Sequence, residues 1–157
     1  HNQNGALKIE DQTVPERADE YGYNDAREAL RQTSQAMAIV RAVSLAVAAQ
    51  EDGSVIYDDN KFSRWGPAID AAIARVHAVR DALQNKASAP DVVDWWTSLA
   101  ILEATGAALW HTAGGLHGDT ALESDQLQSI ADAAMDSLGE MYEALSNVAS
   151  GLSGGAA

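Results

Sequence analysis

The fold is decided by residues 124–152, which read SDQLQSIADAAMDSLGEMYEALSNVASGL. Apolar side chains recur in this stretch at alternating steps of four and three residues, the heptad spacing of a helix with one buried face. They are Leu127, Ala131, Ala134, Leu138, Met141, Leu145, Val148 and Leu152. The spacing predicts a long amphipathic helix, which opens at the capping-box spacing of Thr120 and Glu123.

Three further helices are expected before this one. The first should run from Asn24 to about Gln50, and its apolar residues cover it nearly all round. Such a helix needs neighbours on more than one side, either at the centre of a bundle or in a second subunit. After a loop anchored by aromatic side chains, Pro67 suits the first turn of the second helix, which should end near Lys86. The third should begin at residues 88–91 and end at the glycines 114 and 115.

These segments predict an all-α fold, an antiparallel bundle of about four principal helices in a single domain over residues 24–152. Residues 1–23 are polar and should form a mostly extended arm, with one short helix at Thr13-Val-Pro-Glu16 as an alternative. The Gly- and Ala-rich end, from Gly151 through the tail 153–157, should fray. A chain of 157 residues with 46% hydrophobic side chains can bury one core without disulfides, and it has no Cys.

Charge is divided unevenly along the chain. Residues 1–86 hold all 10 Lys and Arg with 13 carboxylates, whereas residues 87–157 hold 10 carboxylates and no base, so the net charges are −3 and −10. On the last helix, five carboxylates fall opposite the apolar seam and should form one acidic band. The band consists of Asp125, Asp132, Asp136, Glu140 and Glu143. Two interpretations remain open, a merely solvated face and a docking surface for a basic partner.

The net charge of −13 disfavours direct binding to nucleic acid or to anionic lipid. The longest apolar-rich run, residues 36–49, contains Arg41 and has 14 residues, too few for a membrane span. We expect a cytoplasmic protein. Removal of a signal peptide is left open, because the chain begins with His1 rather than Met.

Chemical motifs are weak throughout the sequence. His111 and His117 flank a glycine-containing link and Glu103 lies two helical turns before His111, but the spacing matches no known metal site. The glycines 114, 115 and 118 follow a helix rather than a strand, which indicates a helix cap and not a phosphate loop. No nucleophile, histidine and carboxylate share a recognisable context. We therefore expect no enzyme activity, no cofactor and no metal ion.

Three tryptophans stand out because Trp95 and Trp96 are adjacent, about 100° apart around a helix, and cannot both point into one core. One of them should lie at a boundary, and Trp96 is our candidate for contact with a partner. Trp95, Trp110 and His111 are instead candidates for lining a small-molecule pocket between helices.

The leading hypothesis is a non-enzymatic protein-interaction module, an acidic bundle that binds or inhibits a basic partner protein. Inhibitors, immunity-type partners and adaptors act in this way, and mimicry of nucleic acid is one specific form. The alternatives are a small-molecule sensor or carrier that uses the Trp-lined pocket, and a structural homo-oligomer in which the first helix is covered by its twin.

Overall fold

Four long helices make up the protein in the computed structural model, which describes residues 20–51, 61–91, 93–113 and 124–156. The helices are α2 (Tyr23–Glu51), α3 (Lys61–Gln84), α4 (Trp95–Ala113) and α5 (Ser124–Ala156). Within those ranges the chain forms no strand, and its one β-type contact is an isolated parallel bridge between Glu20 and Ala87. The prediction of an all-α fold with four principal helices is therefore confirmed.

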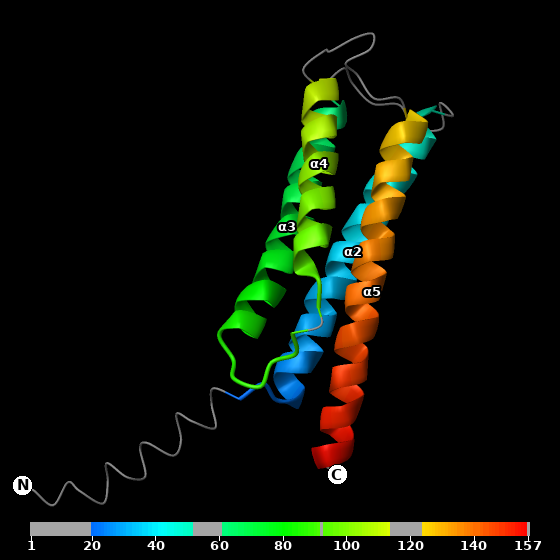
Figure 1. Cartoon of the computed structure of the whole chain (residues 1–157). Coiled ribbons are helices and arrows are strands. Elements are labelled where there is room, and N and C mark those ends of the chain that lie inside the picture. Colours follow the sequence, from blue (N-terminus) through cyan, green and yellow to red (C-terminus); the bar gives the residue numbers. More distant parts are fainter. Residues whose placement is uncertain (1–19, 52–60, 92, 114–123, 157) are drawn as a thin grey trace, which may run out of the picture.

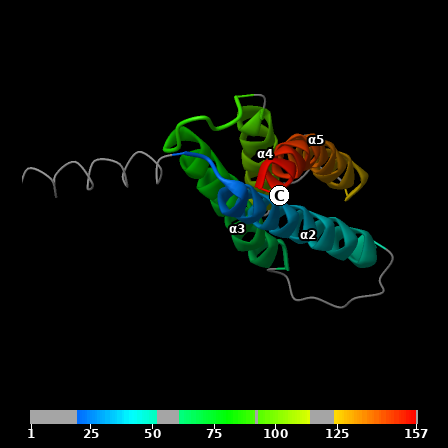
Figure 2. The same ribbon diagram turned by 90° about the horizontal axis from the view of Figure 1, so that it is seen from below.

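Successive helices run in opposite directions and lie side by side (Figure 1). Each one packs on the next along the chain, and α5 closes the ring by packing along α2. Seen from below, α2 lies diagonally across from α4, and α3 lies diagonally across from α5 (Figure 2). The bundle is therefore antiparallel, as predicted. The first helix has neighbours on two sides, α3 and α5, as each of the other helices has two, so of the two alternatives the central position is not the one observed.

The heptad seam of α5 is the centre of the core. Six of its eight residues are buried, and the remaining two, Val148 and Leu152, pack against the core from partly exposed positions. Side chains from the other helices complete this core, among them Val40, Val47, Ile69, Val76, Leu102 and Leu109, all nearly inaccessible to water. Several buried neighbours are alanines, including Ala36 on α2 and Ala72 on α3. Small side chains at these positions let the helices approach closely.

The start of α3 differs from the prediction. The helix begins at Lys61, so Pro67 lies inside it rather than in its first turn. A proline lacks the N–H of a helical hydrogen bond and costs about 3 kcal/mol in a helix interior. The extra turns bury the Trp65 indole, which is 7% exposed, and this apolar burial favours the longer helix.

The start of α4 also differs from the prediction, because the helix begins at Trp95 rather than near residue 91. Pro90 restricts the preceding residue to extended backbone, and Ser88 has a positive φ of 61°. The N-cap is Asp94, whose carboxylate accepts hydrogen bonds from the Thr97 amide at 3.0 Å and from the Thr97 hydroxyl at 2.6 Å. This capping fixes where the first turn of α4, with its two tryptophans, begins.

Replacing Asp94 with Ala should lower the free energy of unfolding by about 1 kcal/mol, because the cap is lost. The hydrogen bonds from Thr97, first from its hydroxyl and then from its amide, hold the pKa of the Asp94 carboxyl below its usual value. A carboxyl whose pKa is lower in the folded than in the unfolded state stabilises the fold at pH values above its unfolded-state pKa of about 3.9. This stabilisation disappears as the pH falls through the folded-state pKa.

Urea denaturation at a series of pH values tests this prediction. The difference in the free energy of unfolding between the native protein and Asp94→Ala should be largest at neutral pH and should disappear in acid. Asp94→Asn, which keeps a capping side chain without a charge, is the control and should show no such pH dependence. An equal gap at every pH would contradict the capping role assigned to the carboxylate.

The segment before α2 is held at the lower end of the bundle. The Tyr21 amide donates a 2.9 Å hydrogen bond to the carbonyl of Ala87, and the Tyr21 ring is buried. Burial, with a smaller contribution from the Asp25 charge, raises the pKa of Tyr21 to about 12. The last residues of the predicted arm thus pack on the bundle, whereas residues 1–19, including the alternative helix at 13–16, lie outside the described residues.

At the other terminus α5 continues to Ala156, beyond the boundary predicted near residue 152. Alanine is the strongest helix former, and the glycines among the last residues do not stop the helix before this point.

Candidate docking surface on α4 and α5

The acidic band lies on the outer side of α5. All five carboxylate residues, Asp125, Asp132, Asp136, Glu140 and Glu143, are exposed. At 100° per residue they fall within an arc of about 80° on the side of the helix opposite the buried seam. The buried seam fixes the orientation of α5, and the carboxylates on the opposite side of the helix therefore face water.

The described ion pairs belong to the other half of the protein. Arg31 pairs with Glu28 on α2, Arg80 pairs with Asp81 on α3 at 2.8 Å, and Lys86 approaches Asp25 to 3.9 Å. In the part of the chain that the structure describes, no ion pair involves the acidic band, and residues 87–157 contain no Lys or Arg. Arg41 of α2 lines a pocket together with Asp132 and is a base beside one end of the band, whereas α4 and α5 themselves supply no Lys or Arg.

Charge is consequently separated across the bundle. The α3 sequence carries Lys61, Arg64, Arg75 and Arg80 against two carboxylates, Asp70 and Asp81, which gives a net charge of +2. The charged residues of the α5 sequence are the five carboxylates of the band, which give it a net charge of −5. Because α5 lies diagonally across the bundle from α3, the helix with the acidic band does not pack on the helix with a net positive charge.

A groove of about 210 Å³ lies between the acidic band and the start of α4, and its lining residues are Asp94, Thr97, Ser137, Glu140 and Met141. Behind it the hydroxyls of Ser98 and Ser137 form a 2.7 Å hydrogen bond between α4 and α5. Glu140 of the band and the Asp94 cap thus reach the same groove from two helices.

The two adjacent tryptophans at the start of α4 have different surroundings. Trp95 is partly buried and packs on the core, and its indole N–H is buried without a hydrogen-bond partner among the described residues. Trp96 is 63% exposed, which makes it the most exposed large apolar side chain in that part of the chain. The sequence-based candidate for contact with a partner is therefore freely accessible.

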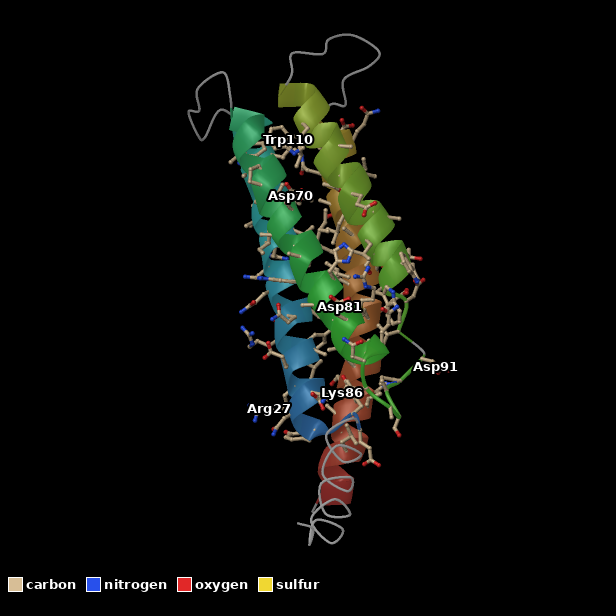
Figure 3. All side chains as sticks on the ribbon, turned by 90° about the vertical axis from the view of Figure 1, so that its left-hand side faces the viewer. Arg27, Asp70, Asp81, Lys86, Asp91 and Trp110 are labelled. Atoms are coloured by element: carbon tan, nitrogen blue, oxygen red, sulfur yellow. The ribbon has the colours of Figure 1, made fainter. Side chains whose placement is uncertain are left out.

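Trp110 lies near the other end of α4, between α4 and the beginning of α3 (Figure 3). Its ring covers Gly66, since a Cβ atom at that glycine would lie 2.5 Å from the indole Cε2. It is nevertheless 47% exposed. Trp95 and Trp110 are 15 residues apart, about 22 Å along the helix, so they do not line one small pocket. His111 belongs to α4, but its side chain lies outside the described residues.

The outer side of α4 forms a continuous surface that the sequence did not predict. Six exposed residues follow one side of this helix, and we call them the Trp face: Trp96, Ala100, Glu103, Ala104, Ala107 and Trp110. Apart from the adjacent pair Glu103 and Ala104, these residues follow one another at steps of three and four, which places them all on one side of the helix. The spacing could be found in the sequence, but the residues on the opposite side of α4 are also apolar and recur at helical spacing. Spacing alone therefore did not show which side of α4 faces water.

Metal and membrane sites have no support in the described residues. No three His, Asp or Glu side chains among them are grouped closely enough to hold a metal ion, and His117 and the glycines 114, 115 and 118 lie outside them. None of the four helices, over the ranges described, is long and apolar enough to cross a membrane. Comparisons with known protein families, with curated proteins and with solved structures find no match to this chain.

Proposed function

We propose that this protein is a non-enzymatic interaction module whose acidic band on α5 docks a basic surface of a partner protein. The observation that supports this best is the set of five exposed carboxylates without a single basic residue on α4 or α5. A helix that only needs to be soluble usually alternates acidic and basic residues at spacings of three and four, which stabilises it. In α5 the like charges of Asp132, Asp136 and Glu140 stand four residues apart and repel one another.

A basic partner would relieve this repulsion. It would also be attracted from a distance, because the protein has a net charge of −13 and all five carboxylates of the band are exposed. Complementary charge acts mainly on the rate of encounter and on the choice of partner. This is the behaviour of an inhibitor, an immunity-type partner or an adaptor.

The test measures binding of a flexible cationic peptide, composed of Lys, Gly and Ser, by calorimetry. Changing all five residues of the band to Asn or Gln should weaken binding on the order of 10- to 100-fold, since exposed charge pairs contribute roughly 0.2–1 kcal/mol each. Raising the ionic strength from about 0.01 M to about 1 M shortens the screening length from about 30 Å to about 3 Å and should weaken binding similarly.

A matched pair of variants controls for net charge. Asp132→Asn with Asp136→Asn removes two carboxylates from the band, and Asp70→Asn with Asp81→Asn removes two exposed carboxylates from α3, where Figure 3 shows both residues. Only the first pair should reduce the affinity for the peptide. Equal losses would mean that the peptide responds to net charge and not to the band, which would refute the proposal.

A further inference from the structure

The Trp face of α4 is a largely apolar surface that faces outward, and of its two indoles Trp110 also packs over Gly66 of α3. Trp96 and Trp110 are 63% and 47% exposed, and the three residues Ala100, Ala104 and Ala107 lie between them. The two indoles are 14 residues apart, which is about 21 Å or nearly four turns of helix. Exposed apolar surface of this length is typical of interaction sites, and tryptophan is the residue most enriched among those that dominate binding energy.

The Trp face and the acidic band lie on the outer sides of two neighbouring helices. The Ser98–Ser137 hydrogen bond sets α4 against α5, and near it Thr97 and Glu140 line the same groove. From this point the two helices run antiparallel (Figure 1), so the sequence order from Glu140 back to Asp136 and Asp132 on α5 runs in the same direction as the order from Trp96 to Trp110 on α4. A protein segment bound on the Trp face would thus contact apolar surface and would have the carboxylates of the neighbouring helix α5 to one side.

Charge repulsion makes a second copy of this chain an unfavourable partner for the Trp face. Glu103 is the midpoint between Trp96 and Trp110, so an antiparallel two-fold pairing that stacks the indoles would bring two Glu103 carboxylates together. A parallel pairing would also bring the two Glu103 side chains together. Burying unpaired like charges is strongly unfavourable, and α4 and α5 contain no Lys or Arg to pair with them.

We propose that the Trp face receives a basic amphipathic helix of the partner, an inference that rests on the proposed function. The apolar side of that helix covers the three alanines, whose small side chains allow close approach, and its ends contact Trp96 and Trp110. One Lys or Arg pairs with Glu103, and others face Asp136 and Glu140. The partner element is therefore an apolar stripe about four turns long, flanked by basic residues.

Three synthetic peptides of about 18 residues, or five turns, test this. The first has a Leu stripe at helical spacing and Lys elsewhere, the second has the same composition in shuffled order, and the third has Glu in place of Lys. Calorimetry measures affinity for the native protein. In parallel, the emission of the exposed Trp96 should shift to the blue when the first peptide covers it, and the other two peptides should bind at least 10-fold more weakly.

Variants of the protein locate the binding. Trp96→Ala and Glu103→Lys should each weaken binding of the first peptide by 10-fold or more. The matched control for Glu103→Lys is Asp70→Lys, because Asp70 is an exposed carboxylate on α3, diagonally across the bundle from α5. Its affinity for the first peptide should be within two-fold of that of the native protein. Circular dichroism checks that each variant is folded.

Each contrary outcome has a distinct meaning. If the shuffled peptide binds as well as the first and still depends on the five carboxylates, the acidic band docks basic chains and the Trp face does not. If the Glu peptide binds as well as the Lys peptide, the occupant is not basic. Self-association that Trp96→Ala abolishes would identify a second copy instead. If neither Lys peptide binds, both this inference and the proposed function fail.

Discussion

Replacing Leu138 with Ala is expected to lower the free energy of unfolding by about 2–5 kcal/mol. Leu138 is fully buried in the middle of the α5 seam. Its truncation removes apolar area from the core and leaves a cavity, and the surrounding helices close over such a cavity only in part. Because small domains have a total stability of about 5–15 kcal/mol, this single change removes a large share of it.

Urea denaturation followed by circular dichroism measures the effect. The midpoint should fall while the dependence of free energy on urea concentration stays the same, since the surface exposed on unfolding hardly changes. Leu45→Ala makes the same chemical change at a position that is 60% exposed, and it should alter the stability by no more than about 0.5 kcal/mol. Similar losses in both variants would mean that the α5 seam is not the centre of the core.

Replacing Asp136 with Lys is expected to change stability and binding in opposite directions. Asp132 and Glu140 lie four residues before and after it, so the substitution turns two repulsive pairs into two attractive ones. At roughly 0.2–0.5 kcal/mol for each pair lost or gained, the free energy of unfolding should rise by about 1 kcal/mol. The affinity for a cationic peptide should fall on the order of 10-fold, because a base now stands within the acidic band.

Asp70→Lys is the matched control for this experiment. Asp70 is also an exposed helical aspartate, but no charged residue stands three or four positions from it on α3. Neither stability nor peptide binding should change appreciably. If Asp136→Lys raises the stability and leaves the affinity intact, the acidic band is a solvated face. If it fails to raise the stability, repulsion along α5 is too weak to matter.

The parts of the fold that could be predicted are those in which one side of a helix differs from the other. In α5 the apolar period identified both the buried residues, such as Leu138, and by exclusion the outward positions of Asp132 and Asp136. Here the core and one candidate surface came from the same observation. The start of α3 was missed because Pro67 resembles a first-turn residue, although Trp65 continues the stripe of Ile69 and Ala72.

The Trp face illustrates what sequence spacing could not decide. Around α4 the residues Leu99, Leu102 and Leu109 are buried, whereas Trp96 and Trp110 on the opposite side are exposed. Both sets recur at helical spacing. The buried side is chosen by where α3 and α5 lie, which is a property of the packed bundle and not of the α4 sequence alone.

The hydrogen bond from the Tyr21 amide to the Ala87 carbonyl has a mechanical consequence. It joins the point where the chain enters α2 to the connection that follows α3, and Lys86 and Asp25 approach each other close by. Tension applied to the chain before residue 20 therefore reaches two helices at once. The first turn of α2 does not unravel alone under load, because the tyrosine must first leave its buried site and release the end of α3.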